Sequence, residues 1–160
     1  MAKKLEESLS YPFDVAQIVS QRRQIKKLLL GARESYLKKK IAILAGANAE
    51  QLSGFVELFL LKQGIAPEFW VSDYNQFFSA ALSPPFSLKE FAPDIIYVFT
   101  NHRNISQWPA SGDSGEKAQA LLREEQQKWV TVWTHLQKQK HKTIIQNKLE
   151  MTLFRNMGNA

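Results

Sequence analysis

A short apolar run, IAILA at 41–45, is followed directly by Gly46-Ala47-Asn48 and then by an amphipathic segment at 49–63. A continuous apolar run of this length is typical of a strand that is buried on both faces of a parallel sheet. In the segment after the turn, apolar residues recur every three or four positions, as they do on one face of a helix. Asn48 with Gln51 resembles a capping box at the start of that helix. Strand, tight turn and helix in this order form half of a βαβ unit.

The rest of the chain repeats this alternation. We predict helices at 14–38, 49–63, 74–82 and 116–138, and strands at 41–45, 68–71, 94–99 and 142–145. Asp14 is the expected N-cap of the first helix. Alternating strands and helices favour an α/β fold with a three-layer, doubly wound parallel sheet and right-handed crossovers. The expected organisation is a basic N-terminal helical extension at 1–40 and an α/β domain at 41–160.

The composition fits one globular domain in a reducing compartment. The chain has 160 residues, of which 44% are hydrophobic and 22% charged, and a chain of this length buries a substantial core. It contains no cysteine, which excludes a disulfide framework, a thiolate metal site and a cysteine nucleophile. The first residues lack the apolar core of a signal peptide, and no run is long enough to span a membrane. We therefore expect a soluble, cytoplasmic protein.

The net charge of +6 is concentrated at the N-terminus. Residues 1–40 contain ten Lys and Arg against four Asp and Glu, whereas residues 41–160 contain eleven of each. Arg22, Arg23, Lys26 and Lys27 lie largely off the apolar stripe of the first helix and are candidate partner-binding residues. A basic helix of this kind contacts phosphate, an anionic membrane surface or an acidic protein, or it is simply a solvated face. Because the remaining residues are neutral, we expect neither a nucleic-acid nor a membrane partner.

Four polar loops follow the predicted strands. Ligands of open α/β sheets bind beyond the carboxyl ends of the strands, so these loops are the candidate ligand pocket. Amide side chains hold carbonyls, hydroxyls or oxyanions, although asparagine is also an ordinary turn residue. The candidate residues are Gly46, Ala47, Asn48, Ser72, Asp73, Asn75, Asn101, His102, Arg103, Asn104, Gln146 and Asn147.

Specific catalytic motifs are missing from the sequence. It contains no G-x-x-x-x-G-K-[ST], G-x-G-x-x-G or G-x-S-x-G segment. His102, His135 and His141 do not have metal-ligand spacing, and the latter two are more simply surface or boundary residues. We expect no metal and no cofactor.

Six segments together resemble the N-terminal domain of FkbH-like proteins. They are LKKKIAILAG at 37–46, ELFLLKQGIAPEF at 57–69, SDYNQ at 72–76, PDIIYVFT at 93–100, RNI at 103–105 and IIQN at 144–147. The resemblance implies an SGNH-hydrolase-like or flavodoxin-like domain that precedes a phosphatase domain of the haloacid dehalogenase type in the same polypeptide. Such proteins are associated with loading a three-carbon glyceryl unit onto an acyl carrier protein for polyketide synthesis.

The sequence lacks the catalytic residues of that pattern. Ala47 stands where the SGNH fold places its nucleophilic serine, and alanine cannot attack a carbonyl. The Asp-x-x-His block, the Asp-x-Asp motif of the phosphatase domain, and a final strand and helix are missing, so we expect a domain truncated at its C-terminus, with 149–160 leading onward. Which asparagine of 101–104 occupies the oxyanion position is open.

The sequence is therefore compatible with two functions. The first is a non-catalytic binding or docking domain of an FkbH-like protein, whose basic N-terminal helix contacts an acyl carrier protein. The alternative is an active esterase or acyltransferase with another nucleophile, such as Ser72 or a residue beyond position 160.

Overall fold

The fold is built on a parallel sheet of four strands. The computed structural model describes residues 2–138 and 142–149. Strands β1 (Leu37–Ala45), β2 (Ile65–Val71), β3 (Ile95–Phe99) and β4 (Thr143–Gln146) lie in the order β2-β1-β3-β4, and all neighbouring pairs are parallel. The predicted α/β fold with a parallel sheet flanked by helices is confirmed.

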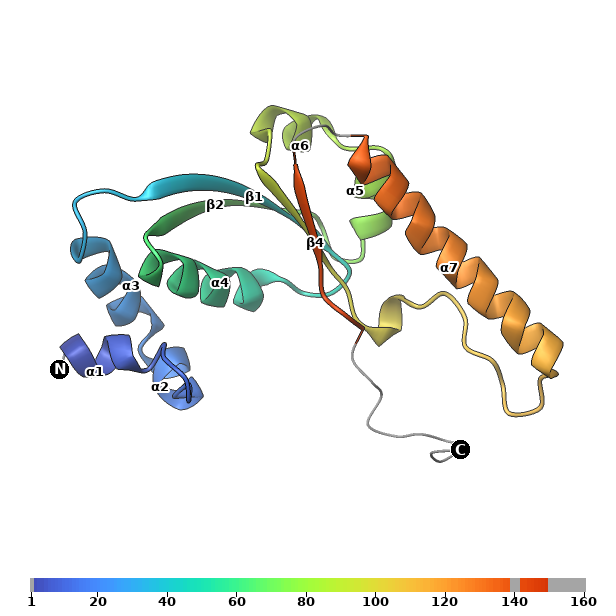
Figure 1. Cartoon of the computed structure of the whole chain (residues 1–160), viewed down its shortest axis with the longest axis horizontal. Coiled ribbons are helices and arrows are strands. Elements are labelled where there is room, and N and C mark those ends of the chain that lie inside the picture. Colours follow the sequence, from blue (N-terminus) through green and yellow to red (C-terminus); the bar gives the residue numbers. More distant parts are fainter. Residues whose placement is uncertain (1, 139–141, 150–160) are drawn as a thin grey trace.

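Helices cover both faces of the sheet (Figure 1). On one face α4 (Glu50–Lys62) packs over β1 and β2, and α3 (Arg22–Gly31) packs against α4. The other face contacts α5 (Phe77–Leu82), α6 (Phe86–Phe91) and α7 (Gly115–Gln137). Successive residues of β1 alternate between the two cores, which accounts for its continuous apolar sequence: Ala42 and Leu44 face α5 and α7, whereas Ile41 and Ile43 face α4.

The predicted single helix at 14–38 is wrong. The segment forms α2 (Val15–Ser20) and α3, which are separated at Gln21 by a non-helical backbone with φ −116°. Asp14 does cap α2, because its Oδ1 accepts a hydrogen bond from Gln17 N at 2.9 Å. The first helix, α1 (Ala2–Glu7), and α2 both pack against α3. The break therefore lets Ile18 enter the same core as Leu5 and Leu9, while neighbouring apolar residues of α2 are left outside.

Strand pairing decides where the helical segment stops. Residues 38–40, expected to close the first helix, belong to β1, because their backbone pairs with Ala66, Pro67 and Glu68 of β2. The sheet thus begins inside the segment assigned to the N-terminal extension, and β2 begins three residues earlier than expected.

Other boundaries shift for local reasons. Helix α5 begins at Phe77 because Asn75 has a left-handed backbone with φ 58°, which ends the turn before it. The expected capping box of α4 does not form, since Asn48 Oδ1 accepts from Glu50 N at 3.0 Å and Ala49 is the N-cap. The predictions for His141 and for the chain from 150 onward lie outside the described residues. Within the described ranges, no helix has the length and apolar character needed to cross a bilayer.

Candidate functional site

The loops after β1, β2 and β3 meet at one buried side chain, Asn104. Its Oδ1 accepts from Asn101 N at 2.8 Å, and its Nδ2 donates to Gly46 O at 2.8 Å and to Asn75 Oδ1 at 3.0 Å. Asn104 is 8% exposed and lies in the 3₁₀ helix η1 (His102–Asn104). Three of the predicted loops are therefore joined by one amide whose oxygen and nitrogen are both occupied within the protein.

Gly46 makes this junction possible. Its N–H donates to Phe99 O at 2.7 Å, which brings the end of β1 against the end of β3. A Cβ atom at this position would lie 2.6 Å from Asn104 Oδ1, closer than such atoms approach one another. The glycine is thus required for close approach and not for its backbone angle.

The other residues of the first two loops have local roles. Ala47 is half-buried and Asn48 is exposed beside the start of α4. Ser72 is buried, and its Oγ accepts from Ala45 N at 2.8 Å and donates to Asp73 O at 3.2 Å. Because the hydroxyl proton of Ser72 is directed at a carbonyl, no basic side chain activates it in this arrangement.

The third loop is closed on itself. Asn101 Oδ1 accepts from Arg103 N at 2.9 Å, and the Asn101 and Asn104 side chains form a reciprocal capping box around η1. His102 is half-buried, whereas the Arg103 side chain is exposed at the rim. Among the described residues of this loop, Arg103 is the charged group that faces solvent.

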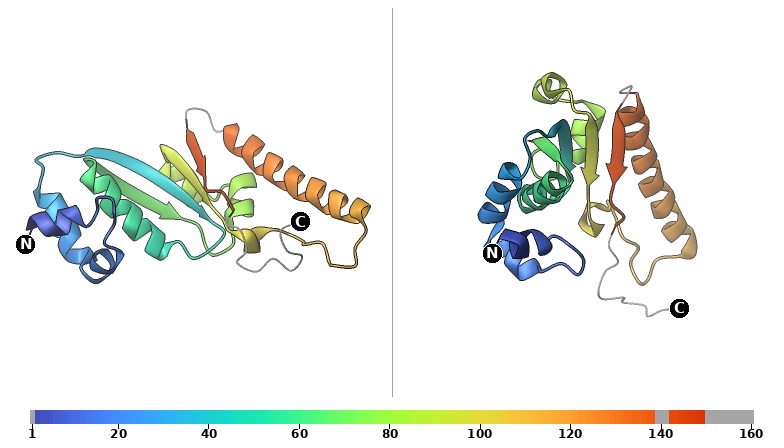
Figure 2. Two further views of the ribbon diagram at one scale, coloured as in Figure 1. Left: turned by 60° about the horizontal axis from the view of Figure 1, so that its bottom comes forward. Right: turned by 60° about the vertical axis from the view of Figure 1, so that its left-hand side comes forward.

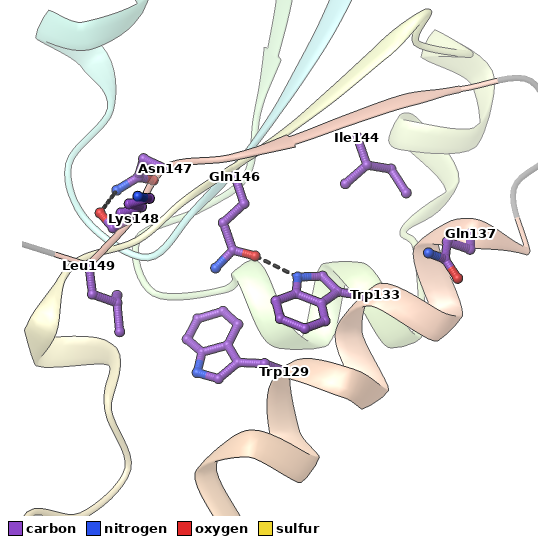
Figure 3. Close-up of a pocket in the computed structure, with 8 residues that line it drawn as sticks. All are labelled: Trp129, Trp133, Gln137, Ile144, Gln146, Asn147, Lys148 and Leu149. Atoms are coloured by element: carbon purple, nitrogen blue, oxygen red, sulfur yellow. Dashed lines mark hydrogen bonds between the residues drawn. The ribbon is translucent and has the colours of Figure 1, made fainter.

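The fourth loop joins a different part of the molecule. Asn147 extends the pairing of β4 with β3, since its Oδ1 accepts from Thr100 N at 3.1 Å and its Nδ2 donates to Thr100 O at 2.6 Å. Gln146 instead faces α7, where its Oε1 accepts from Trp133 Nε1 at 2.6 Å (Figure 3). Trp129, Trp133 and Leu149 line a groove of about 600 Å³ there. Gln146 is therefore separate from the Asn104 junction.

A hollow of about 540 Å³ lies between the ends of β1 and β2. Ala45, Ala47, Ala49 and Val71 supply apolar surface, and Asn48, Ser53, Ser72 and Tyr74 supply neutral polar groups; Glu50 is the charged residue of the lining. Such a lining suits an uncharged ligand with hydroxyl or amide groups. Nowhere in 2–138 and 142–149 do three His, Cys, Asp or Glu side chains gather in a way that would hold a metal ion.

An ion pair on α7, which no sequence motif predicted, supports the third loop. Lys128 Nζ donates to Asn104 O at 2.6 Å and to Ser106 Oγ at 3.0 Å, and it pairs with Glu125 at 2.6 Å. Burial raises the pKa of Glu125, but hydrogen bonds from Lys128 and from Ser106 N outweigh it and hold this pKa below its ordinary value. The i,i+3 spacing of the pair was visible in the sequence, but its loop partner was not.

The four candidate partner-binding residues of α3 fall on two flanks. Arg22 lies with its guanidinium over Gly54 of α4, and Lys26 Nζ pairs with Glu57 Oε1 of the same helix at 2.7 Å. Arg23 and Lys27 are exposed, and neither makes an ion pair within the described part of the chain. Two of the four residues thus lie against α4, although Arg22 remains exposed, and the other two face solvent.

Comparison of the sequence with protein families and with curated proteins gives no match. Among solved structures, the fold is similar to the N-terminal part of the protein BF1531 from Bacteroides fragilis, which contains a phosphatase domain and was crystallised with Mg. The TM-score is 0.64 at 15% sequence identity, and the match covers 86% of this chain and 35% of that one. The chain thus spans about a third of that structure and shares its fold over that part.

Proposed function

We propose that this chain is a non-catalytic, SGNH-like docking domain of an FkbH-like protein. A phosphatase domain of the haloacid dehalogenase type in the same polypeptide then performs the phosphate chemistry, and a glyceryl-type unit is loaded onto an acyl carrier protein in polyketide-type biosynthesis. In this proposal helices α1 to α3 form the basic extension predicted for residues 1–40, and the SGNH-like domain predicted for 41–160 begins at Leu37 with β1. The cysteine-free sequence fits a cytoplasmic location.

The fold is consistent with such a protein. It is similar to part of a structure that contains a phosphatase domain, and the six sequence segments imply a phosphatase domain in the same polypeptide. Because that likeness concerns the fold, the carrier protein and the glyceryl unit rest on the sequence resemblance.

The observation that carries the proposal is the chemistry at the end of β1. The methyl group of Ala47 replaces the hydroxyl that an SGNH hydrolase needs, and the Asn104 amide beside it is fully engaged with Gly46, Asn75 and Asn101. An oxyanion-stabilising donor must point at the reacting atom, and here the amide N–H groups point at protein oxygens. The junction is built to hold three loops in place, which suits binding better than acyl transfer.

The surroundings of Ser72 weigh against the esterase alternative. Ser72 Oγ is buried and hydrogen-bonded to the backbone of Ala45 and Asp73, so an attack by this oxygen would require breaking both bonds. We expect the wild-type chain and the Ser72→Ala variant both to hydrolyse activated esters no faster than buffer alone does. A hydrolysis rate well above buffer that Ser72→Ala abolishes would replace the docking proposal by the esterase.

The partner proposal has its own test. We expect calorimetric titration of the full chain with a holo acyl carrier protein to give measurable binding. The affinity should fall when Arg23 and Lys27 are both changed to Glu. The double variant Lys89→Glu with Arg123→Glu, on exposed residues of α6 and α7, serves as the charge-matched control. If wild-type protein shows no binding, or if the control loses as much affinity as the Arg23 and Lys27 variant, the carrier-protein role is wrong.

A further inference from the structure

Several large apolar side chains of α2 and of the loop before it lie on the surface. Tyr11 is 88% exposed, Phe13 50%, Val15 63% and Val19 58%. Both valines have the spacing of one apolar face in the helix predicted at 14–38, a face that we would expect to be buried. The break at Gln21 turns the helix axis, so that Ile18 alone of the valine and isoleucine side chains of α2 reaches the core.

These side chains form an ordered surface and not a loose loop. The Phe13 ring packs edge-on against Phe59 of α4 with centroids 5.3 Å apart, and Tyr11 packs edge-on against Phe13 at 6.0 Å. Val15 and Val19 are one helical turn apart and both face outward. Clustered exposed apolar side chains mark interaction sites on soluble proteins.

Positive charge borders this surface. Val19, Arg22 and Arg23 line one hollow of about 460 Å³ at the junction of α2 and α3, with Ser20, Gln21 and Gln24 as its other lining residues. No acidic side chain contributes to that lining. Arg22 is exposed but lies over Gly54 of α4, whereas Arg23 and, one turn further along α3, Lys27 are exposed on the solvent side.

We infer that this surface, formed by Tyr11, Val15, Val19, Arg23 and Lys27, docks an acidic amphipathic helix of a partner protein. The valines offer two apolar contacts at helical spacing, the hollow receives one partner side chain, and the cations pair with Asp or Glu beside the apolar face. The inference rests on the proposed docking function and names the surface and the chemistry of the partner.

The shape favours a protein helix over an anionic membrane. A membrane-surface helix presents a long apolar face to a flat boundary, whereas α2 has six residues and ends at a concave junction. A knob-shaped side chain fills such a hollow, and a bilayer surface does not.

Fluorescence anisotropy with the full chain tests the inference. The probe is a labelled, helix-stabilised peptide of Leu and Glu with an apolar face; its controls are a scrambled peptide of the same composition and a Leu/Lys peptide. We expect the wild-type chain to bind the Leu/Glu peptide selectively. Val19→Asp, and the double variant Arg23→Glu with Lys27→Glu, should each lower the affinity about tenfold.

Matched control variants lie on the opposite side of the molecule. Leu122 on α7 is 61% exposed, and Arg123 of α7 and Lys89 of α6 are exposed. Leu122→Asp and the double variant Lys89→Glu with Arg123→Glu therefore make the same changes of charge far from α2 (Figure 2). Both should bind the peptide as the wild type does, and circular dichroism checks that all variants fold. Equal binding of the scrambled peptide, equal losses in the control variants, or binding only to vesicles of phosphatidylcholine and phosphatidylglycerol would each overturn the inference.

The two proposals fail separately. If the holo acyl carrier protein binds but Val19→Asp leaves its affinity unchanged, the docking surface is wrong and the proposed function stands. If the carrier protein does not bind while the acidic peptide binds at α2, the surface stands and the proposed function is wrong.

Discussion

Replacing Gly46 with alanine tests whether the Asn104 junction organises the end of the sheet. The new Cβ would lie 2.6 Å from Asn104 Oδ1 and 2.8 Å from its Cγ and Nδ2, so the amide would have to move and release its hydrogen bonds. Overpacking of this kind lowers the free energy of unfolding by about 1–3 kcal/mol. Because Gly46→Ala also leaves buried polar groups without partners, we expect a loss of about 3 kcal/mol.

Removing the amide itself gives the second arm of a double-mutant cycle. Asn104→Ala leaves Gly46 O and Asn101 N without their partners, at about 1–3 kcal/mol for each buried group, so we expect a loss of about 3 kcal/mol. Once the Asn104 side chain is gone, the alanine Cβ at position 46 has room. The double variant should therefore be no less stable than Asn104→Ala, which gives a coupling of about 2–3 kcal/mol.

Urea denaturation followed by far-ultraviolet circular dichroism measures the free energy of unfolding of each variant. Gly112→Ala is the matched control, because a Cβ there meets no atom within 4 Å; it should change stability by less than about 1 kcal/mol. Additive losses in the double variant, or a Gly46→Ala variant as stable as the Gly112→Ala control, would refute this account of the junction.

Three further changes test other parts of the structure by the same denaturation assay. Thr100 is fully buried, and its Oγ1 has no hydrogen-bond partner among the residues that the structure describes. Thr100→Val should therefore leave the free energy of unfolding unchanged or raise it by about 1 kcal/mol; a clear loss of stability would mean that the hydroxyl is hydrogen-bonded. Gly64 has φ +81°, so Gly64→Ala should cost about 1–2 kcal/mol, and no cost would exclude the left-handed backbone. The pKa of Glu125 is lower in the folded protein than in the unfolded chain, so its ionised, paired form stabilises the fold at a pH above the ordinary carboxylate pKa. This stabilisation is lost as the pH falls and Glu125 becomes protonated. Glu125→Gln should therefore be less stable than wild type at neutral pH and should narrow that gap on acidification; a constant gap would contradict the pairing with Lys128.

Much of the fold follows from local patterns in the sequence. The apolar runs at 41–45 and 95–99 were predicted as buried strands, because a short continuous apolar run between turn residues is typical of a strand between two helical layers. Helices α4 and α7 were found to within a residue or so because their apolar stripes are long and regular. Asp14 was recognised as a cap because capping depends on residues only three positions apart.

Other local structure depended on partners far away in the chain. The apolar period of 14–38 is compatible with one helix or with two, and packing of α1 and α2 against α3 selects two. Lys38 to Lys40 suit a helix end, but the ladder with β2 makes them strand. Periodicity reports which apolar residues share one face of a helix, and it does not report whether another element covers that face.

The sequence by itself determined which residue types follow each strand: a glycine-alanine turn after the first strand and amide-rich loops after the others. It also determined that the net positive charge lies in the N-terminal segment. Only the tertiary structure decided that the side-chain amide of Asn104 joins three of these loops, because its hydrogen bonds connect residues up to 58 positions apart. It also decided that Arg22 and Lys26 bind α4 while Arg23, Lys27 and the valines of α2 face solvent. Side chains on one helix share a sequence pattern, but the neighbouring helix selects which flank is buried and which remains free to meet a partner.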